Sequence, residues 1–392
     1  MKKGLYDLLV ARGLVDNVTS DELKTRIDTP CKLYLGIDPT ADSLHLGHLA
    51  GLSIAKWFLD YGHSVVILIG GATARVGDPS GKSLERPLLE LEEVTSNARA
   101  LMTQVKGILG QHAHIEFVDN YDWFSGLNLL CFMRDIGKHF RLGVMLSKDS
   151  VKNRLYSEEG ISFTEFSYQI LQAYDFLVLF ENKGVELQIG GSDQWGNITA
   201  GTDLIRKVLK KEAHGLTFPL LTRSDGKKFG KSESGAVWLS KEKGSSFDLY
   251  QYLYRVPDAD VINLLLKLTH LPLEEIQQLE EGMQGKDPVN TAQKKLAEPL
   301  NPTIRTDVLD KLEQKKIYSV SELSSFPIYK VIVSKDGRQS QVVTIDTPET
   351  DFPSPKPSPV PSPESNNNLE NNSSSASQSA IITGSEISAA EQ

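Results

Sequence analysis

The sequence predicts an α/β protein with a mostly parallel sheet, followed by a small helical domain. Three observations support this fold class. Strand-like and helix-like segments alternate over the first 220 residues, which is typical of βαβ units. The run "SVVILIG" at 64–70 is almost continuously apolar, as in strands buried on both faces of a parallel sheet. Residues 246–300 contain helix-like segments such as "DADVINLLLKLTHL".

The elements follow in order along the chain. We expect strands at 31–37, 64–70, 114–120 and 185–190, and helices at 44–60, 90–109, 125–140 and 163–181. These elements predict an α/β domain over 1–220, a mobile Gly- and Lys-rich loop or linker over 221–245, and a helical domain over 246–300. The segment 301–350 is mixed, with strand-like "YKVIVS" and "QVVTI", and the low-complexity tail 351–392 is expected to be disordered.

Composition indicates a soluble cytoplasmic protein without a membrane partner. Apolar residues make up 40% and charged residues 24% of the 392 residues, and we find no apolar run long enough for a membrane span. Two cysteines form no disulfide framework, which favours a reducing compartment. The net charge of −9 does not indicate nucleic acid binding, although a local basic patch remains compatible with it.

The stretch "GIDPTADSLHLGHLAG" (36–51) places His45 and His48 at the predicted start of helix 44–60. Asp42 or Ser43 is expected to cap this helix. Two interpretations stay open from this motif alone. Either the imidazoles are structural, or they bind a nucleotide phosphate at the helix N-terminus, with Gly47 admitting a flat ring. Zinc is disfavoured because no third-ligand motif accompanies the pair.

Three further motifs fall just after predicted strands or where the α/β domain ends. For each of them, a purely structural interpretation competes with ligand binding. "KKFGKS" (227–232) is either a solvated basic loop or a pair of phosphate donors. "GGATARVGDPSGKSLER" (70–86) misses the P-loop spacing by one residue and otherwise indicates a flexible turn. "QIGGSDQWGN" (188–197) is a strand followed by a glycine turn. The histidine pair and the lysine pair together favour binding of a triphosphate.

The combination resembles the class I aminoacyl-tRNA synthetases, and most closely the bacterial and organellar tyrosyl-tRNA synthetases. The resemblance covers about 4–297, and its most specific stretches are "YLGIDPTADSLHLGHL", "GDPSGKSLER", "GISFTEFSYQILQAYDF" and "GGSDQWGNI". It implies a Rossmann-like catalytic domain, an anticodon-binding-like helical domain and a homodimer with Phe163 near its interface. It also implies that L-tyrosine is activated by ATP with Mg²⁺, without a tightly bound metal, and transferred to the 3′ end of tRNA(Tyr).

The resemblance also implies roles for individual residues, which fall into three groups. The catalytic group, which stabilises phosphate charge, comprises Thr40, His45, His48, Lys82, Arg86, Lys228 and Lys231. The tyrosine-binding group comprises Tyr34, Asp78, Tyr168, Gln172, Asp175, Gln188 and Gln194. The ATP-binding group comprises Gly36, Asp38, Gly47, Gly191, Asp193 and again Lys231.

Within the tyrosine-binding group, Tyr168, Gln172 and Asp175 share one face of the predicted helix 163–181. The solvated face of an amphipathic helix is the simpler interpretation of that spacing. The resemblance instead places Tyr168 and Gln172, with Asp78, on the substrate ammonium, and Asp175 with Tyr34 on its phenol. A buried phenol needs such polar partners.

Four alternatives remain open at the level of sequence. Tryptophanyl-tRNA synthetases share the architecture, although Tyr34 with Asp175 favours a phenol over an indole. A small-molecule nucleotidyltransferase and a non-enzymatic RNA-binding protein are the second and third. After "TAQKKLAE" the chain departs from the family pattern, with no recognisable basic RNA-binding stretch in 300–392. The fourth alternative is therefore a truncated or divergent synthetase that activates tyrosine but binds tRNA poorly.

Overall fold

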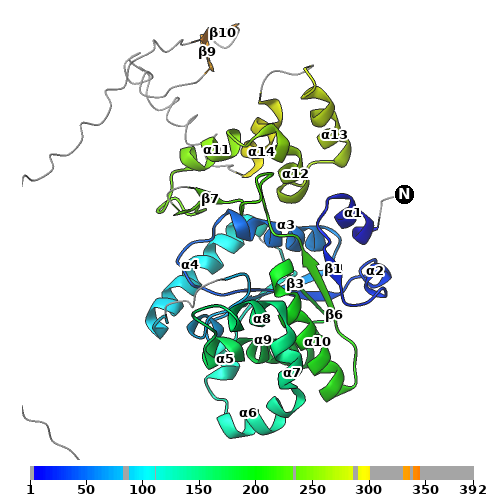
Figure 1. Ribbon diagram of the computed structural model, residues 1–392. Coiled ribbons are helices and arrows are strands. Elements are labelled where there is room, and N and C mark those ends of the chain that lie inside the picture. Colours follow the sequence, from blue (N-terminus) through cyan, green and yellow to red (C-terminus); the bar gives the residue numbers. More distant parts are fainter. Residues whose placement is uncertain are drawn as a thin grey trace, which may run out of the picture. The chain divides into compact units, whose positions relative to one another are not determined.

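The computed structural model describes residues 4–82, 88–110, 112–232, 235–285, 290–300, 330–335 and 339–344. It divides the chain into two compact units, Met1–Lys315 and Lys316–Gln392 (Figure 1). The described part of the second unit is an antiparallel hairpin of β9 (Lys330–Lys335) and β10 (Gln339–Thr344), where two strands were predicted. The tail 351–392, predicted to be disordered, lies outside the described residues.

The first unit contains a mixed sheet of six strands in the order β1-β6-β5-β2-β3-β4. The strands are β1 (Asn17–Val18), β2 (Lys32–Ile37), β3 (Ser64–Ile69), β4 (Ile115–Asp119), β5 (Leu187–Gly191) and β6 (His214–Phe218). Every pairing is parallel except that of β1 with β6. The four predicted strands, and with them the predicted α/β class, are confirmed, whereas β1 and β6 were not predicted.

Side chains of the central strands alternate between two apolar layers. On β3, Val65 and Ile67 join the larger layer, whereas Val66 and Leu68 join the smaller one, as the two-residue period of a strand requires. Helices α3 (Leu46–Asp60) and α4 (Leu91–Leu109) cover the first face. Helices α9 (Phe163–Lys183) and α10 (Trp195–Leu209) cover the second (Figure 1). The result is a three-layer α/β/α arrangement.

The predicted single helix 125–140 is wrong, because this region forms several short pieces. They are α5 (Tyr121–Phe124), α6 (Leu129–Asp135), the 3₁₀ turn η2 (Gly137–His139), α7 (Leu142–Ser147) and α8 (Asp149–Leu155). The Asn128 side chain accepts the Cys131 N–H at 3.1 Å, and α6 starts at Leu129, four residues later than predicted. The remaining short elements before β6 are α1 (Leu5–Ala11), α2 (Leu23–Arg26), η1 (Thr73–Arg75) and η3 (Ser192–Gln194).

The predicted helical region contains α11 (Ser246–Tyr254), α12 (Asp258–Leu268), α13 (Leu273–Gly282) and α14 (Thr291–Leu300). Arg12, which is buried at the end of α1, fixes this region to the rest of the unit. Its guanidinium donates to the Leu266 and Thr269 carbonyls at 3.0 Å each, at the C-terminal end of α12, and also to the Leu271 carbonyl. The same group lies 4.5 Å from the ring centroid of Trp57 on α3. Arg12 thereby gives hydrogen-bond donors to carbonyls at and just beyond the end of α12, where a helix leaves such groups without an intrahelical partner.

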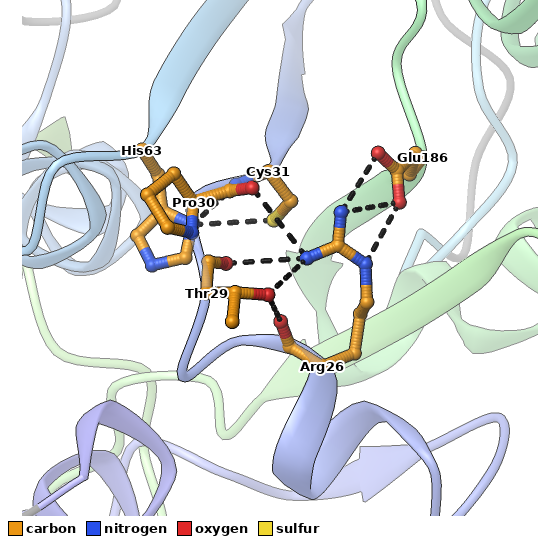
Figure 2. Close-up of polar contacts among 6 residues, drawn as sticks. All are labelled: Arg26, Thr29, Pro30, Cys31, His63 and Glu186. Carbon is orange, nitrogen blue, oxygen red and sulfur yellow. Dashed lines mark hydrogen bonds and ion pairs between the residues drawn. The ribbon is translucent and has the colours of Figure 1, made fainter.

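At the N-terminal edge of the parallel strands, polar contacts join the residues that precede β2, β3 and β5 (Figure 2). Arg26 forms a bidentate ion pair with Glu186, with N···O distances of 3.0 and 2.9 Å. The Cys31 N–H donates to Nδ1 of His63 at 3.1 Å. Burial raises the pKa of the Cys31 thiol to about 11 and lowers the pKa of His63, so both groups are neutral near pH 7. This pair is therefore structural and not an activated thiolate.

No helix in the described part of the chain is long and apolar enough to cross a membrane.

Candidate active site

A cavity of about 490 Å³ opens at the C-terminal edge of the sheet. Strands β3 and β4 follow β2 on one side of the sheet, and β5 and β6 lie on the other, so the chain changes direction between β2 and β5. Such a switch point is where open α/β sheets bind ligands, because the loops beyond the two strands diverge there. Residues that follow β2, β3 and β5 line this cavity together with Lys228, Phe229 and Gly230.

The predicted site residues converge on this cavity. Those that line it are Tyr34, Gly36, Asp38, Thr40, His45, Gly47, His48, Asp78, Lys82, Tyr168, Gln172, Asp175, Gln188, Gly191, Asp193, Gln194 and Lys228. Arg86 lies outside the described residues, and only the backbone of Lys231 is described. The structure thus brings together side chains from segments up to 194 residues apart, since Tyr34 and Lys228 line the same space.

One end of the cavity is aromatic and contains unsatisfied polar atoms. Tyr34 on β2 is the register partner of Gln188 on β5, directly across the switch point. Both side chains are buried, yet Tyr34 Oη and Gln188 Oε1 find no hydrogen-bond partner among the described residues. Buried polar atoms without partners are uncommon and costly, so this end is suited to a ligand that supplies a hydroxyl or another polar group.

Asp175, from α9, adds a carboxyl group to the same end. Its oxygens accept the indole N–H of Trp123 at 2.9 Å and the amide of Asn120 at 3.1 Å. Burial raises the pKa of Asp175 well above its ordinary value, and these two donors oppose that shift. Burial, and then the charge of Asp175, likewise raise the pKa of the Tyr34 phenol. Fixed hydrogen bonds therefore hold Asp175 in one orientation.

A hydrogen-bonded chain runs from Asp175 along the cavity wall. Asn120 also donates to Thr73 Oγ1 at 2.9 Å, and Thr73 donates to Asp38 at 2.8 Å. The Tyr168 hydroxyl donates to the second oxygen of Asp38 at 2.8 Å. Asp38, which the resemblance assigned to ATP, therefore lies beside residues assigned to the amino acid.

Asp78 is the third carboxylate of this region. Its oxygens accept Gln194 Nε2 at 2.7 Å and the Ser80 N–H at 3.0 Å. Asn197 connects the group by donating to Gln172 at 3.0 Å and to Gln194 at 3.2 Å. Carboxylates gathered in a partly buried wall lower the energy of a cation, so this part of the cavity is suited to an ammonium group.

The cavity also contains basic side chains. Lys82 and Lys228 both line it, and Lys228 Nζ donates to the Gly81 carbonyl at 3.2 Å. Burial raises the pKa of Asp193 and the charge of Asp78 adds to this, while the charges of Lys228 and Lys82 lower it. A Cβ at Gly191 would lie 2.6 Å from an Asp193 oxygen, so a side chain there would displace Asp193. One cavity therefore contains both carboxylates and lysines.

The predicted cap of α3 is wrong, because His45 itself is the N-cap residue and neither Asp42 nor Ser43 takes that place. His45 Nδ1 accepts the Gly47 N–H at 3.0 Å, and His48 Nδ1 accepts the His45 N–H at 3.1 Å. The ring that lies against Gly47 is that of His45, since a Cβ there would be 2.8 Å from its Cε1. An imidazole whose Nδ1 accepts carries its proton on Nε2 and can donate it to an anion.

Backbone hydrogen bonds join the loop that carries Lys228 and Lys231, here called the lysine loop, to the start of α3. The Gly230 carbonyl accepts the Val237 N–H at 2.8 Å, and the Val237 carbonyl accepts the Leu46 N–H at 3.0 Å. The Leu239 N–H then donates to the Leu44 carbonyl at 2.8 Å. Between them, β7 (Lys231–Ser232) pairs with β8 (Gly235–Ala236). The two motifs that the sequence singled out are thus physically connected.

Sequence reasoning missed Thr73, Asn120, Trp123 and Asn197. Asn120 ends a predicted strand at the ligand-binding edge of the sheet, and Asn197 stands in the "GGSDQWGN" motif, so position could have indicated both. Trp123 belongs to a short helix that carries no comparable signal.

Comparison with known proteins agrees with this geometry. The family described as "tRNA synthetases class I (W and Y)" matches residues 26–317. A tyrosine–tRNA ligase of Protochlamydia amoebophila is 56% identical over 300 residues, covering 76% of this chain and 71% of that protein. A chloroplastic/mitochondrial tyrosine–tRNA ligase of Arabidopsis thaliana is 52% identical over 309 residues, covering 76% of this chain and 60% of that protein.

Among solved structures, a C-terminally truncated mitochondrial tyrosyl-tRNA synthetase of Aspergillus nidulans is 32% identical, with a TM-score of 0.67. It covers 78% of this chain, and this chain covers 94% of it. This chain therefore belongs to the tyrosyl-tRNA synthetases, within the class I family of tryptophanyl and tyrosyl enzymes.

Proposed function

We propose that this chain activates L-tyrosine with ATP and transfers the tyrosyl group to the 3′ end of tRNA(Tyr). One observation carries the proposal. A single cavity offers unsatisfied buried atoms of Tyr34 and Gln188, several carboxylates and two lysines. Tyrosine has the matching phenol and ammonium, and ATP has the matching phosphates. Six relatives at 47–56% identity are named tyrosine–tRNA ligase, so tryptophan activation is not favoured.

In the first step, a tyrosine carboxylate oxygen attacks the α-phosphorus of ATP. The new bond forms as the bond to the bridging oxygen of the leaving pyrophosphate breaks, and the product is tyrosyl-adenylate. The carboxylate is already ionised near pH 7, so the step requires no general base. The protein has to align the reactants and stabilise charge on the phosphates. A terminal ribose hydroxyl of tRNA then attacks the acyl carbon and releases AMP.

The proposed roles are grouped by the part of the substrates that each residue would bind. Asp175 and Tyr34 bind the phenol, Gln188 lines the pocket, and Gln194 lies near the carboxylate. Asp78, Tyr168 and Gln172 hold the ammonium. Asp193, with Gly191, accepts the ribose hydroxyls, and Gly36, Asp38 and Gly47 complete the nucleotide site. The charge-stabilising group is Thr40, His45, His48, Lys82, Arg86, Lys228 and Lys231.

Mg²⁺ is proposed to enter with ATP, as it commonly does with nucleotide triphosphates. Among the described residues, no group of three or more histidine, cysteine or carboxylate side chains could hold a metal ion. We place the protein in the cytoplasm on its cysteine usage, a proposal that imaging of the tagged chain would decide.

The function is tested by ATP–pyrophosphate exchange with each aromatic amino acid and by charging of tRNA(Tyr). We expect exchange with tyrosine and little with tryptophan or phenylalanine, because only tyrosine carries a phenol that can pair with the buried polar atoms of Tyr34, Gln188 and Asp175. Exchange driven by tryptophan would overturn the substrate assignment. Exchange with tyrosine but without charging of tRNA would restrict the function to activation.

Replacing Asp175 tests the selection of tyrosine. In Asp175→Ala, the ratio of kcat/KM for tyrosine over phenylalanine should fall by about 10–100-fold, because tyrosine loses one polar partner and phenylalanine loses none. Exchange kinetics with both amino acids measure the ratio, and thermal unfolding checks that the variant folds. An unaltered ratio in a folded variant removes Asp175 from this role.

Replacing His45 tests charge stabilisation. Asparagine is a good N-cap residue, so His45→Asn preserves the start of α3 but removes the Nε2–H donor. The rate of adenylate formation should fall by roughly 10²–10³-fold, as for loss of one transition-state donor. Equilibrium dialysis should show tyrosine binding nearly unchanged. The exposed His112 provides the control substitution His112→Asn. An equal loss of binding and rate would contradict the assignment.

We also propose a homodimer. Nine of the thirteen exposed large apolar side chains in the described part of the chain lie between Leu129 and Phe163, and the resemblance places Phe163 near the interface. Phe163 is 74% exposed. Sedimentation should give twice the chain mass of 43.3 kDa. Phe163→Asp should weaken association. The control Val10→Asp, at another exposed apolar site, should leave association unchanged. A monomeric wild-type protein would refute the dimer.

A further inference from the structure

The lysine loop rests on a tyrosine of the helical region. Gly230, in the middle of "KFGKS", donates its N–H to the Tyr252 hydroxyl oxygen on α11, with an N···O distance of 3.1 Å. The neighbouring Phe229 is 6% exposed, and its ring centroid lies 5.4 Å from that of Tyr252. Tyr252 does not line the main cavity, so it acts on the loop and not on the ligands.

Gly230 is the point where a shift of the loop would matter most. Its φ of +83° is a conformation that glycine adopts readily, and a Cβ here would lie 3.0 Å from the Leu46 Cβ. Its carbonyl begins the hydrogen bonds that lead through Val237 to the start of α3. Lys228 stands two residues before it and Lys231 one residue after. Holding Gly230 therefore fixes the backbone from which both lysines extend.

Further hydrogen bonds hold the segment that leads into the lysine loop. The Ser224 N–H donates to Asp260 of α12 at 2.6 Å, and the Phe229 N–H donates to the Leu221 carbonyl at 2.8 Å. The segment 221–230 is thus held as a hairpin against α11 and α12. Burial raises the pKa of the Tyr252 phenol, so the hydroxyl stays protonated and neutral near pH 7.

We propose that Tyr252 is a positioning residue for adenylate formation, acting through Gly230 to hold Lys228 and Lys231 against the phosphates. The inference rests on the proposed function, because it concerns the leaving pyrophosphate. It assigns the helical region a task in the first reaction step. Without the hydroxyl, the Gly230 N–H loses its acceptor and the loop its fixed position, while the tyrosine-binding end of the cavity stays unaltered.

The test is Tyr252→Phe, which removes one oxygen and keeps the ring that packs on Phe229. We expect kcat for tyrosine-dependent exchange to fall about 10–100-fold, as expected for a donor left without its partner. The KM for tyrosine should change less than about two-fold, a split that general destabilisation would not produce. Tyr254→Phe is the matched control, since Tyr254 lies on the same helix and stacks on Tyr250. Equal rates in wild type and Tyr252→Phe would overturn the proposal.

A second background tests whether Tyr252 acts through the lysines. In a chain that already carries Lys228→Ala and Lys231→Ala, adding Tyr252→Phe should lower single-turnover adenylate formation less than about two-fold. The same large loss in both backgrounds would show that Tyr252 acts by another route and would overturn the proposal.

Amide hydrogen exchange separates this inference from the proposed function, because it needs no substrate. Exchange at Gly230 should become more than about ten-fold faster in Tyr252→Phe and stay unchanged in Tyr254→Phe. If the wild-type protein shows no tyrosine-dependent reaction, the proposed function fails, and the role of Tyr252 in adenylate formation fails with it. If the reaction occurs but Gly230 exchange is the same in all three proteins, the positioning role alone fails.

Discussion

The site depends on a short series of backbone hydrogen bonds between residues 44–46 and 230–239. These bonds connect the start of α3, which carries His45 and His48, to the loop that carries Lys228. Side-chain contacts between flexible lysines and imidazoles would not hold such a geometry, since each lysine loses much rotamer freedom on being fixed. A main-chain connection fixes the relative position of the two motifs before any phosphate binds. That is the preorganisation that stabilisation of developing charge requires.

Carboxylates and lysines line the same cavity, and they are held in different ways. The chain Asp175–Asn120–Thr73–Asp38–Tyr168 satisfies every carboxylate oxygen it includes from a fixed donor, so the acidic wall stays in place when a ligand is absent. Lys82 and Lys228 line the same cavity, and their charges act on Asp193. In the proposed function, the fixed acidic groups bind the amino acid, and the flexible lysine side chains stabilise charge as it moves from the α-phosphorus to pyrophosphate.

Sequence reasoning succeeded where the signal is local and failed where it depends on pairing. Apolar runs such as 64–70 predicted strands because burial on both faces leaves no polar positions. The convergence of motifs was predictable because the carboxyl ends of parallel strands share an edge. The register that sets Tyr34 beside Gln188 is non-local, and no pattern within either strand encodes it. The cap of α3 was mispredicted because histidine is not a usual cap residue, and only the fold shows His45 in that place.

Helix α3 connects the helical region to the proposed catalytic site. Its N-terminal end carries the imidazoles, and Trp57 near its other end lies under Arg12, whose guanidinium holds the end of α12. Helix α11, which carries Tyr252, packs with α12 on the common helix α14, so both helices belong to the same frame as the histidines. Asp260 and Tyr252 then hold the loop. The contacts form a closed circuit of α3, α12, α11 and loop. The loop is therefore held twice, by its backbone hydrogen bonds to the start of α3 and by its contacts with α11 and α12.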